Sequence, residues 1–375
     1  MTPAPDGPSS APPPPPPYPP PYWAPYPPPA PAGRPAGKSA SFYVAILLFV
    51  LLVASGFLNV ILFAAAIASM AMGGAAAGGG DNPFVAQFAE TTVSGDPAAR
   101  EKVLVVSLAG LIFDGDVSGG LVPAEGPVSA IRRRLAAARK DPNVVGVILE
   151  IDSPGGGVTA SDLIHREITR FRAEKKVPVA AWMKDVAASG GYYAAAASER
   201  IFATPTTITG SIGVILQLVN YGDLFEKVGL EQVTIIPSET PFKDMGSPTR
   251  PMRDDERAKF DSIVTQMYER FVSVVKAGRP ALSMERVREL ANGAVMTGDE
   301  AAKAGLVDEI GYLEDALAWV RLASGATDAR AVRWSPHPTF LQSLIGASAP
   351  TTASPLDPLL SRLSAGPRFL YLWQE

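Results

Sequence analysis

Two glycine-rich turns near the middle of the chain could carry out chemistry on a carbonyl group. Residues 152–158 read Asp-Ser-Pro-Gly-Gly-Gly-Val, and residues 187–193 read Ala-Ala-Ser-Gly-Gly-Tyr-Tyr, with Ser189 between small neighbours. Consecutive glycines let backbone N–H groups approach an oxyanion closely, and small neighbours at the start of a helix would expose a nucleophilic serine. Each turn also has a structural interpretation, as a tight turn and as a helix N-cap at Ser189.

A serine nucleophile needs a base, and the sequence supplies few histidines for that role. His165 falls on an expected amphipathic helix and His337 in an irregular region. Neither histidine is therefore a good candidate for the base of a Ser-His-Asp triad. A neutral lysine can replace histidine as the general base. Lys184 and Lys243 are both candidates, and the residues around them do not decide between the two.

The composition excludes several other kinds of site. The 375 residues include no cysteine, which removes thiolate metal ligands, cysteine nucleophiles and disulfides together. With only two histidines, we expect neither a metal site nor a cofactor. The formal charge of −4 provides no basic face, so nucleic-acid binding is not expected.

Strands and helices alternate around the two turns. Apolar, β-branched runs predict strands over residues 103–108, 144–151, 177–182, 201–203, 212–216 and 233–236. Helical periodicity predicts helices over residues 127–140, 160–175, 188–198 and 260–275, and a short helix near Leu224. Thr297 with Glu300 is a capping-box pattern, and Gly305 suits the end of that helix. This order predicts an α/β layered structure with parallel strands.

The N-terminal part of the chain has a different composition. Residues 1–38 contain 18 of the 37 prolines, which predicts an extended, solvated segment. It has two interpretations, a flexible tether or a ligand for a proline-binding domain. Residues 42–72 are apolar and uncharged, which favours a membrane-spanning helix over a cleaved signal peptide or a core helix. Cations precede this span and carboxylates follow it, so we expect residues 1–38 in the cytoplasm.

The remaining segments complete the expected organisation. We expect a linker over residues 73–100, a globular domain over residues 101–325, and an irregular tail over residues 326–375. The tail is rich in Ser, Pro and Ala and closes with the apolar run Phe369–Trp373.

Taken together, five motifs resemble those of the signal peptide peptidase A family of serine peptidases, whose fold is related to Clp protease and crotonase. The motifs lie at residues 153–157, 187–193, 209–214, 243–248 and 305–308. The resemblance implies a Clp protease/crotonase-like layered β-β-α core. It also implies the site: Ser189 as nucleophile, Lys243 as general base, Ser211 orienting the lysine, and the N–H groups of Gly156 and Gly190 as the oxyanion hole. Because that lysine acts only when neutral, activity should rise with pH.

The resemblance also implies a biological setting. The expected protein is a ring-like homo-oligomer in the cell membrane, single-pass, with its peptidase domain outside the cytoplasm. It would degrade cleaved signal peptides or other membrane-proximal peptides, cutting at small apolar residues. A separate expectation, not implied by the resemblance, is that residues 347–349 of the tail can enter an active site. Three alternatives are a site-specific peptidase for one membrane protein, a crotonase-type acyl-CoA enzyme and a non-catalytic membrane scaffold.

Overall fold

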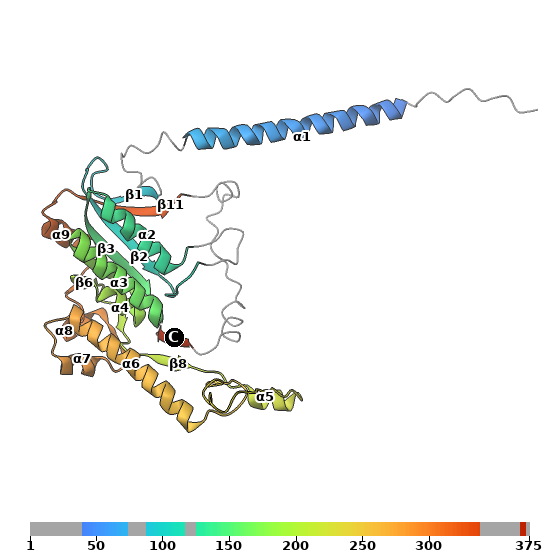
Figure 1. The fold of residues 1–375 in the computed structure, drawn as a ribbon. Helices are drawn as coiled ribbons and strands as arrows, with labels where there is room; N and C mark the ends of the chain where they lie inside the picture. Colours follow the sequence, from blue (N-terminus) through green and yellow to red (C-terminus); the bar gives the residue numbers. More distant parts are fainter. Residues whose placement is uncertain (1–39, 74–87, 117–124, 338–367, 373–375) are drawn as a thin grey trace, which may run out of the picture. The chain divides into compact units, whose positions relative to one another are not determined.

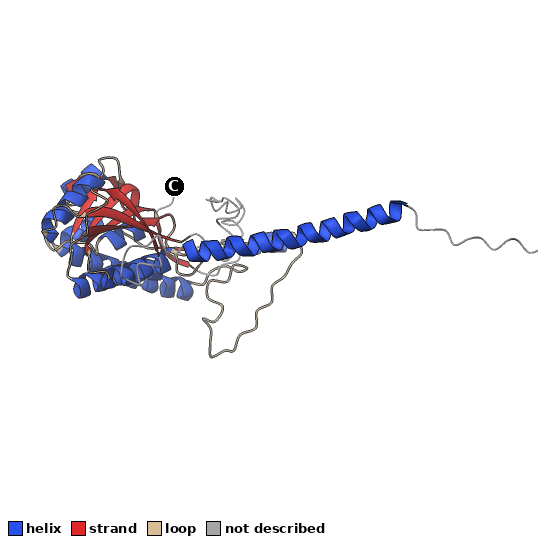
Figure 2. Ribbon diagram, turned by 90° about the horizontal axis from the view of Figure 1, so that it is seen from above, coloured by secondary structure: helices blue, strands red, loops and turns tan. Residues whose placement is uncertain are grey.

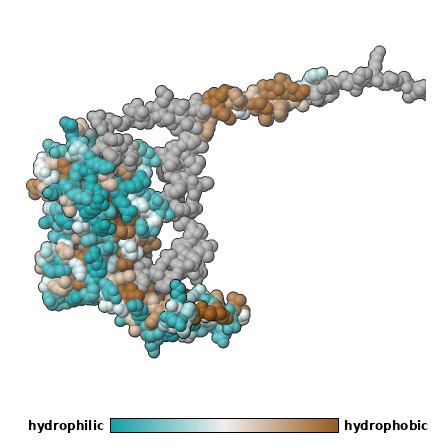
Figure 3. All heavy atoms as spheres, in the orientation of Figure 1, coloured by the Kyte–Doolittle hydropathy of each residue, from teal (hydrophilic) through white to brown (hydrophobic). Residues whose placement is uncertain are grey.

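The computed structural model describes residues 40–73, 88–116, 125–337 and 368–372, in two compact units over residues 1–78 and 79–375. The described part of the first unit is helix α1 (Ala40–Gly73), 34 residues without a charge. Its segment Tyr43–Phe63 has a mean hydropathy of 2.8 and exposed side chains, visible as the apolar helix in Figure 3. Helix α1 is therefore long and apolar enough to cross a bilayer.

The second unit is built on a largely parallel sheet (Figure 1). Its strand order is β1 (Phe88–Ser94), β11 (Arg330–Pro336), β2 (Lys102–Ala109), β3 (Val144–Ser153), β5 (Val179–Ala188), β6 (Arg200–Ala203) and β10 (Glu309–Ile310). Strand β7 (Ile208–Gly210) pairs in parallel with the C-terminal end of β5, and β9 (Val295–Thr297) pairs antiparallel with β7. Apart from that pair and the edge pair β1–β11, the pairs in this sheet are parallel. The predicted α/β class with parallel strands is confirmed.

Helices cover both faces of this sheet, because its central strands are apolar on both sides (Figures 1 and 2). On one face lie α2 (Pro127–Lys140), α3 (Val158–Lys175), α4 (Gly190–Ala195) and α6 (Asp254–Gly278). They share a core with Leu104, Val106 and Leu149, whereas α9 (Leu313–Ser324) packs on Val103, Val105 and Ile148 of the opposite face.

Shorter helices complete the unit. They are α5 (Gly222–Lys227), α7 (Met284–Leu290) and α8 (Gly298–Ala304). The predicted capping box of Thr297 and Glu300 is present at the start of α8, and Gly305 ends the helix in the left-handed conformation with φ 81°.

A second, three-stranded sheet lies at the end of β3. Its middle strand is β12 (Arg368–Leu372), which pairs antiparallel with β4 (Gly155–Gly157) on one side and β8 (Ile215–Gln217) on the other. The first glycine turn of the sequence is thus itself a short strand, and the end of the chain runs beside it.

Three strands lie in segments for which the sequence predicted no regular structure. The expected linker contains strand β1, and the expected irregular tail contains strands β11 and β12, whose partners lie far away in the chain. Glu90 of β1 accepts hydrogen bonds from Lys102 Nζ and Trp334 Nε1, both at 2.9 Å, which joins the edge strand to the domain. Residues 1–39 and 338–367, including residues 347–349, lie outside the described residues.

Residues 218–253, between β8 and α6, also differ from expectation. The predicted strand at 233–236 is absent, and the predicted strand at 212–216 is reduced to Ile215–Gln217. Val233 and Ile235 are 73% and 91% exposed, because no neighbouring strand or helix of the described chain covers them. An apolar β-branched run here therefore does not form a strand in the single chain.

Candidate active site

Ser189 lies at the junction between β5 and α4. Its backbone has φ 51° and ψ −112°, a conformation that is strained for a residue other than glycine. The strain is held by two backbone hydrogen bonds, from Ser189 N to Gly210 O at 2.9 Å and from Tyr193 N to Ser189 O at 2.8 Å. The Ser189 side chain makes no capping hydrogen bond, so its hydroxyl is not used as a helix cap.

The structure brings the two glycine turns into direct contact. A Cβ atom at Gly190 would lie 3.2 Å from the Gly156 nitrogen and only 2.4 Å from Ser161 Oγ. The first turn is tied down by Ser153, whose hydroxyl donates to Gly110 O at 2.6 Å and accepts from a backbone N–H of the turn. Glycine is required here because the backbones of two separate segments approach more closely than a side chain would allow.

Ser189 and Ser211 line the same open hollow, with a volume of about 760 Å³. Ser211 follows β7 and also has a positive φ, 48°, with its N–H donating to Ala294 O at 2.8 Å. Thr209 Oγ1 donates to Ala187 O at 2.7 Å and so locks β7 against β5. The rest of the wall is formed by Ile212, Gly213, Val214, Ile215, Leu216, Gln217, Val264, Thr265, Tyr268, Ala291, Asn292, Gly293 and Leu372.

Lys243 is not brought to this hollow within one chain. It lies exposed in the 218–253 segment, and it is absent from the described residues that line the hollow around Ser189. The other candidate, Lys184, is half-exposed, with its Nζ 4.0 Å from Asp152 Oδ2. Lys184 is likewise absent from the described part of the wall.

Neither histidine lies in the described wall of the hollow. His165 packs edge-on against Tyr193, with ring centroids 5.4 Å apart, and burial lowers its pKa to about 4. His337 is exposed at the end of β11. Among the described residues, no histidine therefore lies where it could act as a base for Ser189.

A cluster of three polar side chains, next to the helix that follows Ser189, was not predicted from the sequence. Tyr193 Oη donates to Asp162 Oδ1 at 2.5 Å, and Arg270 donates to the same oxygen at 3.0 Å, which joins α3, α4 and α6. Burial alone would raise the pKa of Asp162, but the hydrogen bonds from Tyr193 and Arg270 together lower it. No local sequence signal links these three residues, which are up to 108 positions apart.

The C-terminal strand occupies one side of the site. Tyr371 is fully buried, its ring lies 5.1 Å from that of Tyr193 and 4.7 Å from that of Phe271, and its hydroxyl donates to Met267 O at 2.8 Å. A Cβ at Gly155 would lie 2.1 Å from the Tyr371 carbonyl oxygen and 2.7 Å from the Gly190 nitrogen. An extended peptide segment thus runs directly beside the two glycine turns and Ser189.

Comparisons with known proteins point to one family of peptidases. Residues 171–327 match peptidase family S49. A relative in Enterococcus faecium, provisionally named signal peptide peptidase SppA, is 37% identical over 250 residues, covering 66% of this chain and 72% of its own. The chloroplastic serine protease SPPA of Arabidopsis thaliana is 36% identical and protease 4 of Salmonella typhi 33%. Each match covers 58% of this chain, and 32% and 34% of those longer proteins.

Among solved structures, the 1510-N membrane-bound stomatin-specific protease is similar at 18% identity with a TM-score of 0.40. The match covers 64% of this chain and 99% of that one.

Proposed function

Because the chain belongs to peptidase family S49, it is a serine peptidase, and we propose that Ser189 is its nucleophile and Lys243 its general base. The observation that carries this proposal is strand β12. An extended segment pairs with β4 and β8 beside Ser189, which is how a peptide substrate would be held by its backbone. Peptide bonds are thereby brought to a serine that is already strained and close to two glycine N–H groups.

The proposed reaction follows from these positions. Ser189 Oγ attacks the substrate carbonyl and passes its proton to the neutral Lys243 amine, and the oxyanion accepts hydrogen bonds from the N–H groups of Gly156 and Gly190. The protonated lysine then returns the proton to the leaving amine, and water releases the acyl group with the same lysine as base. Ser211, on the wall of the same hollow, would orient the lysine. Each oxyanion donor is worth on the order of 10²–10³ in kcat.

We infer that Lys243 acts on Ser189 of a neighbouring copy in a ring-like homo-oligomer. The 218–253 segment that carries Lys243 exposes apolar side chains, the patch near α5 in Figure 3, and an apolar surface of this kind is typical of a protein interface. A head-to-tail contact would let one subunit supply the serine and the next subunit the lysine.

Helix α1 supports a membrane anchor. Its apolar length fits one span. Cations before the span and carboxylates after it favour an orientation with residues 1–38 in the cytoplasm and the peptidase unit outside. The substrates are then cleaved signal peptides or other membrane-proximal peptides, and a proline-binding partner for residues 1–38 would lie on the other side of the membrane. A site-specific peptidase for one membrane protein shares this chemistry, and a substrate profile separates the two.

The decisive experiment tests the dyad and its subunit arrangement together. Ser189→Ala and Lys243→Ala should each abolish peptide cleavage, and a fluorophosphonate label located by mass spectrometry should modify Ser189 in the parent protein. Rings assembled from an equal mixture of the two variants should recover about a quarter of the parent activity, because that fraction of interfaces pairs an intact serine with an intact lysine. Full activity in either single variant refutes the dyad, and no recovery in the mixture refutes the shared site.

A further inference from the structure

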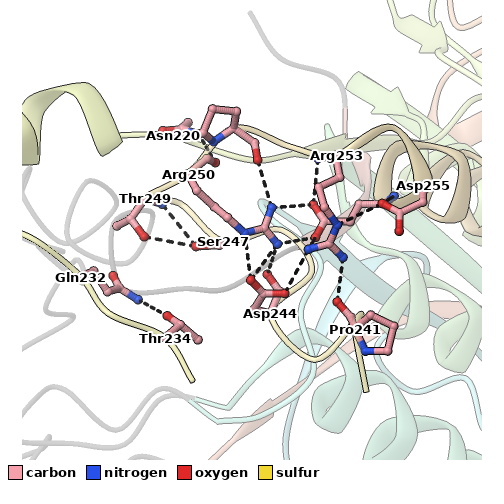
Figure 4. Close-up of polar contacts among 12 residues, drawn as sticks. Asn220, Gln232, Thr234, Pro241, Asp244, Ser247, Thr249, Arg250, Arg253 and Asp255 are labelled. Atoms are coloured by element: carbon pink, nitrogen blue, oxygen red, sulfur yellow. Dashed lines mark hydrogen bonds and ion pairs between the residues drawn. The ribbon is translucent and has the colours of Figure 1, made fainter. Parts of the chain in front are cut away.

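A cluster of charged side chains surrounds the turn that carries Lys243 (Figure 4). The turn itself is short: Lys243 N donates to Thr240 O at 2.9 Å and Met245 N to Phe242 O at 3.1 Å. The 218–253 segment has little regular structure around it, so these two bonds alone would leave the lysine poorly fixed.

Two guanidinium groups hold the backbone on either side of Lys243. Arg253 Nη2 donates to Pro241 O at 2.7 Å, two residues before the lysine. Arg250 donates from Nε to Asp244 Oδ2 at 2.8 Å and from Nη2 to Asp244 O at 3.2 Å, immediately after it. The position of the lysine backbone is therefore set by the positions of these two arginines.

Both arginines converge on Glu256, whose side chain is 0% exposed in the first turn of α6. Arg250 Nη1 donates to Glu256 Oε2 at 3.1 Å, a second bond joins Arg250 Nη2 to Oε1, and Arg253 Nη1 lies 3.0 Å from Oε1. The Arg253 backbone N–H also donates to Glu256 Oε2 at 3.2 Å. The carboxylate thus joins two otherwise repelling cations and attaches them to a 25-residue helix.

The ionisation of these groups agrees with this arrangement. The hydrogen bond from Arg250 lowers the pKa of Glu256, and the same arginine lowers the pKa of Asp244. Both carboxylates therefore stay charged at neutral pH, and a buried charge of this kind is retained only while its partners remain in place.

We propose that Glu256 and Arg250 are positioning residues that fix the Lys243 turn on helix α6, so that the amine is presented at a constant place and angle. This inference rests on the proposed role of Lys243 as general base. Neither Glu256 nor Arg250 belongs to the described wall of the Ser189 hollow, so they act through Lys243 and not on the substrate.

The test is Glu256→Gln in the full-length assembled protein, with steady-state kinetics on a peptide substrate. A displacement of about 1 Å costs on the order of 10²-fold, so kcat should fall by about that factor while KM stays within about two-fold. Arg250→Lys keeps the charge but loses the planar fork that bonds Glu256 and Asp244 together, so it should lose kcat to a similar extent.

The matched control is Glu269→Gln, on the same helix. Glu269 also accepts two bonds from one arginine, Arg288, each at 2.7 Å, but it contacts nothing near Lys243 among the described residues, and activity should be unchanged. The midpoint of thermal unfolding is measured for every variant. If Glu256→Gln fails to fold, Arg250→Lys decides the question, because it leaves the buried carboxylate paired with Arg253.

The outcomes separate this inference from the proposed function. Parent-like kcat in Glu256→Gln and Arg250→Lys overturns the positioning role and leaves the Ser189–Lys243 dyad intact. A loss of kcat that is matched by a lower unfolding midpoint and a higher KM also overturns it, because that is a general structural effect. If Lys243→Ala itself keeps full activity, the proposed function is the part that fails.

Discussion

The position of β12 predicts that a peptide substrate competes with this strand for the place between β4 and β8. The perturbation is Tyr371→Ala, which removes the ring packed between Tyr193 and Phe271 and the hydrogen bond to Met267 O. Truncating a fully buried aromatic side chain costs about 3–5 kcal/mol in a rigid core. If β12 can leave its place, the substitution destabilises the bound strand relative to the released strand by about 3 kcal/mol. The population with β12 released then rises about 10²-fold.

The assay is hydrolysis of a peptide substrate by the full chain. The apparent KM of Tyr371→Ala should fall by up to about 10²-fold with kcat unchanged, since only access to the groove changes. Tyr371→Phe is the matched control: it keeps the ring and loses only a hydrogen bond worth about 1 kcal/mol, so KM should fall about five-fold. An unchanged or higher KM together with a large fall in the unfolding midpoint would show that β12 is a core strand, and would refute the reasoning.

Two further predictions follow from a buried histidine and from the flanks of α1. Burial lowers the pKa of His165 to about 4 from an unfolded value of 6.5, so the unfolded chain takes up a proton first as the pH falls. The free energy of unfolding should therefore drop by up to about 3 kcal/mol between pH 6.5 and 4, at about 1.36 kcal/mol per pKa unit, and His165→Gln should flatten that slope in denaturant titrations. An identical slope in the variant contradicts this assignment. Protease added to intact cells should digest the unit after residue 78 and spare residues 1–38, and the opposite pattern reverses the topology.

The alternation of strands and helices was readable from the sequence because it rests on local periodicity. The α2 helix was predicted with the bounds Pro127–Lys140, and the strand, glycine turn and helix around Ser189 followed in the predicted order. The same holds for the apolar stretch of α1 and for the capping box of α8, since each is determined by residues that are neighbours in the chain.

Only the tertiary structure decided which distant segments meet at the site. Strand β12 pairs with β4 across more than 200 positions, and backbone hydrogen bonds of this kind leave no mark on side-chain pattern. The 218–253 segment carries strand-like residues, yet it stays exposed because a strand forms only where a partner edge exists. The sequence thus determined which residue types were available for the proposed chemistry. Long-range packing decided that Ser189, Gly156 and Gly190 lie together and that Lys243 lies apart from them, in a turn that Arg250 and Arg253 connect to Glu256.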